Sequence, residues 1–144
     1  MFDVVILSGG FDPVHIGHVK MVQAAAELGE VVVVGVNSDE WLTRKKGKPF
    51  MSYEERVYIM QEIKGVTYAV SFDDSDNSAC DLIKTARSMY GDDVKIAFAN
   101  GGDRVIENIP EVQTCIDNNV EMIWNVGGGK IQSSSDLIKN SLSN

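Results

Sequence analysis

The sequence predicts an α/β fold in which helices cover both faces of a five-stranded parallel sheet. Short apolar segments alternate with segments of helical spacing along the 144 residues, which is typical of parallel sheets. The apolar segments are unbroken runs, as expected for strands that are buried on both faces. Glycine-rich and polar loops follow the strands, at the sheet edge where such folds bind ligands.

Each predicted strand contains a short apolar run. The strands are expected at residues 4–7, 30–36, 66–72, 94–99 and 120–125. The second run holds four consecutive valines, and β-branched side chains favour extended backbone. Their regular alternation with helical segments predicts that all five strands belong to one sheet.

Helices are predicted between the strands. They are expected at residues 16–28, 40–42, 52–64 and 79–90, in part of 105–118, and at 133–142. Ser52 and Glu55 match a capping box, Gly29 is a natural helix stop, and Pro110 suits a helix start. The basic segment 44–48 and the acidic segment 73–78 are predicted to be loops.

Length and composition limit the function classes. A chain of 144 residues with 44% apolar residues predicts one globular domain, residues 1–144. No apolar run approaches the roughly 20 residues of a membrane span, and the first strand begins too early for a signal peptide. Cys80 and Cys115 lack metal or redox spacing, so we expect buried, reduced thiols in a cytoplasmic protein. The net charge of −8 argues against binding to nucleic acid or to anionic membranes.

The turn after the first strand is the strongest functional signal. Gly9 and Gly10 carry no side chain and let the backbone approach a ligand closely. The helix that follows directs free N–H groups and its positive dipole end at the same place, which suits phosphate. His15 and His18, the only histidines of the chain, flank Gly17 beside this turn. Two imidazoles there can donate hydrogen bonds to charge that grows on a phosphoryl group.

Some of these polar segments also have simpler interpretations. The two histidines could be half of a zinc site, but no cysteine or third histidine lies near them in the sequence. The acidic segment 73–78 could hold a metal ion, but we predict a solvated surface turn. The basic segment is more informative, because four of the 13 basic residues fall between positions 44 and 48 of an acidic chain. We interpret it as a local anion site.

The segment from Gly9 to His18 resembles the nucleotidyltransferase signature, in which a glycine and Phe-Asp precede His-x-Gly-His. It is similar to that of the cytidylyltransferase-like superfamily, and the resemblance extends over nearly the whole chain. Segment 37–39, the basic segment and segment 52–56 resemble both glycerol-3-phosphate cytidylyltransferase and the adenylyltransferase domain of the ADP-heptose synthesis enzyme. Class I aminoacyl-tRNA synthetases share the tetrapeptide, but 144 residues leave no room for their anticodon-binding parts.

The resemblance implies a Rossmann-like nucleotidyltransferase fold and a set of site residues. A phosphate oxygen of a small phosphorylated metabolite would attack the α-phosphorus of an NTP that is accompanied by Mg²⁺. Phosphate-binding catalytic roles are implied for His15, His18, Lys45 and Lys48, with Lys46 as a further candidate. Nucleotide contacts are implied for Gly9, Gly10, Phe11, Asp12, Gly17, Gly101, Asp103, Ser133, Ser134 and Ser135. Asp12 could instead orient the turn or act through Mg²⁺, and Arg56 could reach the acceptor phosphate or pair with a neighbouring glutamate.

The resemblance favours ATP over CTP as the nucleotide. The cytidylyltransferases carry Arg-Thr-x-Gly-Ile-Ser-Thr-Thr near the C-terminus, whereas residues 128–135 here lack the arginine. Segment 101–103 is more similar to the adenylyl-transferring relatives. A glycerol-3-phosphate-type cytidylyltransferase and a non-catalytic nucleotide-binding module stay as alternatives, and a homodimer is compatible with each. An NAD(P)-dependent oxidoreductase is disfavoured, since the dinucleotide fingerprint is absent.

Overall fold

The computed structural model describes residues 1–101, 109–124 and 126–127. Within these residues, the strands form one sheet in the order β3-β2-β1-β4-β5, and every pairing is parallel. The strands are β1 (Phe2–Gly9), β2 (Gly29–Val36), β3 (Tyr68–Val70), β4 (Ile96–Ala99) and β5 (Val120–Ile123). The helices are α1 (Ile16–Leu28), α2 (Asp39–Lys46), α3 (Tyr53–Glu62), α4 (Cys80–Tyr90) and α5 (Glu111–Asp117). The predicted α/β fold with five parallel strands is confirmed.

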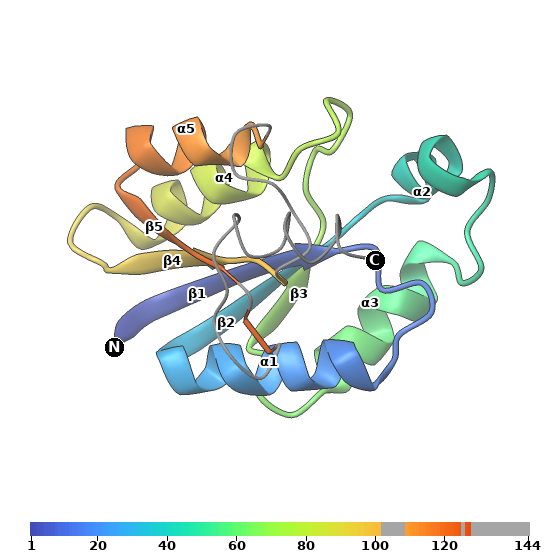
Figure 1. Ribbon diagram of the computed structural model, residues 1–144, viewed down its shortest axis with the longest axis horizontal. Helices are drawn as coiled ribbons and strands as arrows, with labels where there is room; N and C mark the ends of the chain where they lie inside the picture. Colours follow the sequence, from blue (N-terminus) through green and yellow to red (C-terminus); the bar gives the residue numbers. More distant parts are fainter. Residues whose placement is uncertain (102–108, 125, 128–144) are drawn as a thin grey trace, which may run out of the picture.

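Helices cover both faces of the sheet, with α1 and α3 on one face and α4 and α5 on the other (Figure 1). Val5 and Leu7 of β1 pack in a core cluster with residues of α1 and α3, whereas Val4 and Ile6 pack with residues of α4 and α5. All four are at most 1% exposed. Because successive strand residues point to opposite faces, the unbroken apolar run of β1 serves two cores, as predicted. None of the described helices is long and apolar enough to cross a membrane.

Most predicted elements are present, but several ends differ. β1 is longer than predicted, α3 ends at Glu62 instead of 64, and regular pairing in β3 covers only Tyr68–Val70. β3 lies at the edge of the sheet, where a strand is held by one neighbour and pairing is short. The last predicted helix, at 133–142, lies outside the described residues.

The first part of the basic segment is helical, so the predicted loop at 44–48 is wrong there. Arg44, Lys45 and Lys46 form the last turn of α2, and Gly47, with a φ of 96°, is its C-cap. Ser38 caps the other end of this helix through its hydroxyl oxygen. Cations stabilise the negative end of a helix dipole, and glycine adopts positive φ without strain. The basic side chains therefore favour the helix that charge pattern alone did not predict.

Both cysteines carry free thiols. Cys115 is buried, and burial raises the pKa of its thiol to about 12, with the nearby charges of Glu111 and Cys80 acting in the same direction. Cys80 is only half-buried, and its sulfur accepts a hydrogen bond from the Thr114 hydroxyl at 3.0 Å. The prediction of a buried thiol is confirmed for Cys115 and wrong for Cys80.

Candidate active site

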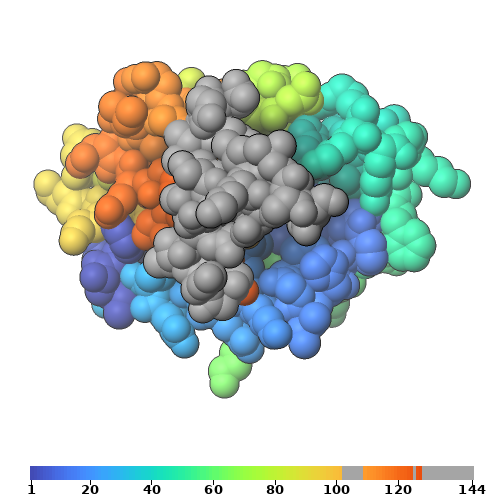
Figure 2. Space-filling model, viewed as in Figure 1, coloured from blue at the N-terminus to red at the C-terminus, as the bar shows by residue number. Residues whose placement is uncertain are grey.

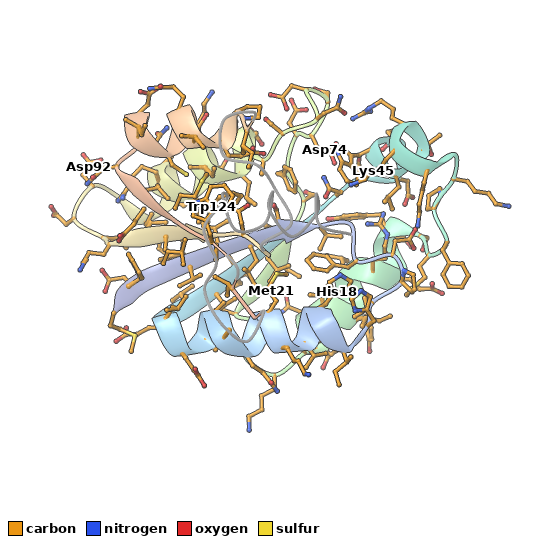
Figure 3. The ribbon with its side chains drawn as sticks, in the orientation of Figure 1. His18, Met21, Lys45, Asp74, Asp92 and Trp124 are labelled. Carbon is orange, nitrogen blue, oxygen red and sulfur yellow. The ribbon has the colours of Figure 1, made fainter. Side chains whose placement is uncertain are left out.

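A cavity of about 740 Å³ lies where the strands end. Its walls come from the ends of β1 and β4, the start of α1, one side of α2, and the loops before α4 and after β5. β1 and β4 are neighbours in the sheet although they are not consecutive in the chain, and α/β folds bind ligands at such a switch point. Figure 3 shows His18 and Met21 on α1 and Lys45 on α2, with Asp92 at the opposite end of the molecule.

The start of α1 holds both histidines in fixed orientations. His15 is the N-cap, and its Nδ1 accepts a hydrogen bond from the Gly17 N–H at 3.1 Å. His18 Nδ1 accepts from the His15 N–H, also at 3.1 Å. The two rings stack with centroids 3.9 Å apart, and the Phe11 ring lies edge-on to His18 at 4.9 Å. The imidazoles therefore complete a reciprocal capping box, which restricts the rotation of each ring.

The same contacts determine which ring nitrogen can donate. A neutral imidazole has one N–H and one acceptor nitrogen. Since Nδ1 accepts in both rings, the proton of each neutral ring is on Nε2, and His15 and His18 both line the cavity. Burial lowers the pKa of His18 to about 4, and the charge of His15 acts in the same direction. His18 is therefore a neutral hydrogen-bond donor at pH 7, which suits a phosphoryl oxygen.

We expect the His18 imidazole to titrate near pH 4 and to carry its proton on Nε2 at pH 7. The unfolded chain binds this proton at about pH 6.5. Between these two pH values the unfolded state binds more protons than the folded state, so stability falls as the pH falls. ¹⁵N NMR of the imidazole nitrogens measures both the tautomer and the pKa. A midpoint near 6.5, or a proton on Nδ1 at neutral pH, would contradict the assignment.

Packing explains the glycines of this segment as much as ligand approach does. A Cβ at Gly17 would lie 2.9 Å from Cε1 of His15, so a side chain there would displace the capping ring. A Cβ at Gly9 would lie 3.1 Å from the Phe11 ring, and one at Gly10 would lie 3.0 Å from a leucine of α2. The glycines therefore allow two rings and α2 to approach the end of β1.

Asp12 fastens the turn after β1 to the segment before α3. Its carboxylate accepts from the N–H groups of Phe50 and Met51 at 2.7 and 2.6 Å and pairs with the Lys46 ammonium at 2.6 Å. Burial acts to raise the pKa of Asp12, but the bonds from Lys46 and the two N–H groups outweigh it and hold the pKa below its usual value. These contacts support the orienting role for Asp12, and they also engage Lys46. Asp12 does not line the cavity.

The basic side chains at 44–48 have different surroundings. Lys45 lines the cavity, and its Nζ lies 4.7 Å from the centroid of the Trp41 ring. Arg44 instead donates to the loop before α4, and Lys48 is exposed without lining the cavity. The space-filling view shows α2 and the segment after it, in teal, at one end of the molecule (Figure 2). Within this segment, Lys45 alone faces the cavity.

Arg56 pairs with an aspartate, so the expected pairing with a neighbouring glutamate is wrong, and it does not line the cavity. Its side chain is 0% exposed, and its Nη2 pairs with Asp39 at 2.7 Å. The guanidinium also donates to the carbonyls of Gly10, Asn37 and Met51, at 2.9, 2.7 and 2.9 Å. Arg56 therefore joins the ends of β1 and β2 to α2 and α3, behind the cavity wall.

The acidic loop before α4 is more than the predicted solvated turn. Asp74 is 5% exposed, and its carboxylate accepts from the Asn37 amide at 3.1 Å and from the Ser38 N–H and hydroxyl, each at 2.8 Å. The Arg44 guanidinium donates to the Asp74 carbonyl at 2.8 Å. Figure 3 shows Asp74 and Lys45 at the same end of the molecule. These bonds tie the loop to the end of β2 and hold Asn37 at the cavity.

Comparison with known proteins identifies the family. The sequence profile of the cytidylyltransferase-like family matches residues 6–140. The chain belongs to the cytidylyltransferase-like family. Among curated relatives, the bifunctional protein HldE of Geobacter sulfurreducens is 32% identical over 94% of this chain, and that of Citrifermentans bemidjiense is 35% identical over 97%. These alignments cover 26% and 27% of the two relatives, so the chain spans about a quarter of their length.

Solved structures share the fold. The lipopolysaccharide core biosynthesis protein of Thermoplasma volcanium GSS1 superimposes with a TM-score of 0.66, covering 86% of this chain and 96% of that chain at 22% identity. A bifunctional NMN adenylyltransferase/ADP ribose pyrophosphatase of Francisella tularensis gives 0.60, covering 96% of this chain and 41% of that chain at 14% identity. A structure from Vibrio parahaemolyticus gives 0.61 over 99% of this chain and 88% of that chain at 17% identity. The fold is the nucleotidyltransferase-like Rossmann fold that the resemblance implied.

The cavity brings together most of the site residues that resemblance to the cytidylyltransferase-like family implied. Those that line it are Gly9, Gly10, Phe11, His15, Gly17, His18, Lys45 and Gly101. Asp103, Ser133, Ser134 and Ser135 lie outside the described residues. Further lining residues, which were not among the expected site residues, include Met21, Trp41, Phe72, Asn77, Asn100 and Glu111. Asn100 carried a weak signal, as a polar residue directly after an apolar strand, and Asn77 lies in the polar segment 73–78, whereas the other four carried none.

The described residues contain no group of three or more His, Cys, Asp or Glu side chains that could hold a metal ion. The carboxylate oxygens of Asp12 are occupied by Lys46 and two backbone N–H groups. Mg²⁺ in nucleotide sites is commonly held by substrate phosphates and water with one or two carboxylates.

Proposed function

We propose that this chain is a nucleotidyltransferase that moves an adenylyl group from ATP to a small phosphorylated acceptor, a sugar phosphate or a polyol phosphate. The observation that carries the proposal is the pair of Nε2–H donors of His15 and His18 at the start of α1, in one cavity with Lys45. A helix N-terminus, imidazole donors and an ammonium group all favour bound negative charge. Together they suit a triphosphate.

In the proposed reaction, a phosphate oxygen of the acceptor attacks the α-phosphorus of ATP. A new P–O bond forms while the bond to the bridging oxygen of the β-phosphate breaks, and pyrophosphate leaves with that electron pair. The substrate supplies the nucleophile, so the protein must position groups and stabilise charge. His15 and His18 donate to the oxygens that gain charge, and Lys45 neutralises charge on the acceptor or the triphosphate. A Mg²⁺ ion bound with the triphosphate would offset part of its charge.

The adenylyl group is favoured by the sequence. Segment 101–103 is more similar to adenylyl-transferring relatives, and residues 128–135 lack the arginine of the cytidylyltransferase pattern. The similarity to the HldE proteins also favours the adenylyl group. The resemblance also favours Asp103 for the ribose hydroxyls and Ser133, Ser134 and Ser135 for the β- and γ-phosphates.

Pyrophosphate release tests the proposal directly. The chain is incubated with Mg²⁺ and either ATP or CTP, against a panel of phosphorylated sugars, polyols and pantetheine. We expect release only when ATP and a sugar or polyol phosphate are both present. Release with CTP and glycerol 3-phosphate would instead indicate the cytidylyltransferase alternative. Nucleotide binding without release for every acceptor would indicate a binding module and would contradict the enzyme.

We expect ATP to bind more tightly than CTP. A site that lacks partners for the edge of a base leaves buried polar atoms unpaired and loses affinity for that base. Calorimetric titration of the two nucleotides at the same Mg²⁺ and salt concentrations measures the difference. CTP binding that is tighter by more than about tenfold, or roughly 1.4 kcal/mol, would assign the chain to the cytidylyltransferases.

We expect Lys45→Ala to weaken substrate binding by roughly tenfold to a hundredfold, since a hydrogen bond to a charged group is lost. Added salt is expected to weaken the wild type in the same direction. Lys84→Ala is the matched control, because Lys84 is exposed on α4 and does not line the cavity. Lys48→Ala distinguishes a direct contact of Lys45 with the substrate from a general effect of positive charge. If Lys48→Ala weakened binding as much as Lys45→Ala, the basic segment would act through its total charge and not through a contact of Lys45.

A further inference from the structure

Asn100 is a buried polar residue at the end of β4 whose side chain has an unused donor. Its backbone is held on both sides, since its N–H donates to the Ile123 carbonyl at 2.8 Å and its carbonyl accepts from the Val126 N–H at 2.9 Å. The residue is 4% exposed. Within the described part of the chain, its amide nitrogen Nδ2 is a buried side-chain atom without a hydrogen-bond partner.

An unused buried donor of this kind is uncommon and unfavourable. The large majority of buried side-chain polar atoms in proteins have at least one partner, and a buried donor without one loses its hydration without compensation. A leucine of similar size would avoid this cost. Asn100 also lines the cavity, so a ligand there can supply the missing acceptor.

The surroundings of Asn100 indicate which part of a ligand lies beside it. β1 lies between β2 and β4 in the sheet. The residues after β1, which include the proposed phosphate-binding histidines, therefore divide the cavity into a half beside β2 and a half beside β4. On the β4 side, the lining includes Met21, Ala99, Gly101 and Val126, together with the carboxylate-bearing Glu111 at the start of α5, and the described lining residues there include no cation. This half suits the nucleoside, which is uncharged.

The other half of the cavity differs in chemistry. On the β2 side, the lining includes the Trp41 and Phe72 rings as well as Asn37, Asn77 and the Lys45 ammonium, and it is the Lys45 charge that suits a phosphorylated acceptor. Met21 also limits the β4 side, because a Cβ at Gly127 would lie 2.6 Å from the Met21 Cα. The backbone after β5 is therefore packed closely against α1.

We propose that Asn100 is a nucleoside-binding residue, whose Nδ2–H donates to an acceptor atom of the nucleoside of the bound NTP. The inference rests on the proposed nucleotidyltransferase function and adds the residue that holds the nucleoside half of the substrate. It assigns a binding purpose to a group that is unfavourable in the free protein. The exchange of stability for binding is a common property of functional sites.

Asn100→Leu tests this with two readouts. The melting temperature is expected to stay the same or to rise, because an unpaired buried amide is replaced by an apolar group of similar size. The affinity for ATP, measured by calorimetry with Mg²⁺, is expected to fall roughly fivefold to tenfold, as for loss of one neutral hydrogen bond. The affinity for inorganic tripolyphosphate is expected to be unchanged, because that probe has no nucleoside.

Asn118→Leu is the matched control. The Asn118 amide is paired, since its Nδ2 donates to the Thr114 carbonyl at 2.8 Å at the end of α5, away from the residues that line the cavity. This variant is expected to lower the melting temperature and leave ATP affinity unchanged. Equal ATP affinities of Asn100→Leu and wild type, or an equal loss for tripolyphosphate, would overturn the inference. A wild type that binds no NTP would instead contradict the proposed function itself.

Discussion

Replacing His18 with alanine is expected to lower kcat by roughly 10² to 10³ while the protein stays folded, by comparison with the loss of one preorganised donor. The Nε2–H of His18 is held in place by the bond between its Nδ1 and the His15 backbone and by its contacts with the His15 and Phe11 rings. The affinity for ATP is expected to change less, because this donor interacts most strongly when charge has developed on the phosphoryl oxygens. Steady-state kinetics with the acceptor found in the panel measure both quantities.

Two further variants separate catalysis from capping. The alanine also removes one bond of the capping box, at a cost of about 1 kcal/mol. A glutamine in that position of a capping box can make the same bond, so His18→Gln is expected to recover stability without recovering kcat. Gln23→Ala, at an exposed position of α1, is expected to change neither. Near-normal turnover of a folded His18→Ala protein would contradict the catalytic assignment.

Replacing Arg56 with alanine is expected to destabilise the protein by about 3 kcal/mol, the lower end for breaking a buried ion pair. The lower end applies because Asp39 is 43% exposed and can regain water. The carbonyls of Gly10, Asn37 and Met51 would lose the donors that Arg56 supplies. Urea unfolding measures the change through the transition midpoint.

Arg56→Lys is the informative companion variant. It keeps the positive charge but lacks the planar fork that serves several acceptors at once, so we expect an intermediate loss. Glu62→Gln, at an exposed position of α3, should lie within about 0.5 kcal/mol of wild type. If Arg56→Ala cost less than about 1 kcal/mol, the buried guanidinium would not be joining these elements in the way that its contacts indicate.

The fold class and the location of the site could be predicted because both depend on local patterns. An apolar run such as that of β1 needs apolar cover on both faces, and helices between the runs supply it. Glycine and histidine around a helix start show where free N–H groups and imidazoles gather. These signals act within a few residues of the chain. The sequence did not predict that His15 and His18 stack and cap the helix, although their spacing of three residues allows both contacts.

The roles of the charged residues could not be predicted, because their partners are far away in the sequence. Arg56 and Gly10 are 46 positions apart, and Asn37 and Asp74 are 37 apart. A charged residue in a polar segment has the local pattern of a solvated one. Burial of such a group is favourable only when distant segments bring several partners to it at once, and no local spacing records that.

The sequence by itself therefore determined the alternation of strands and helices, the parallel sheet and the helix start that carries both histidines. The tertiary structure decided which cation of the basic segment faces the cavity: Lys45 does, whereas Arg44 and Lys46 hold loops. It also decided that Arg56 and Asp74 are internal connectors and that Asn100 keeps an unused donor. The physical reason is range, since backbone periodicity and capping act over three or four residues, whereas burial and pairing of polar groups depend on elements that meet only when the sheet is assembled.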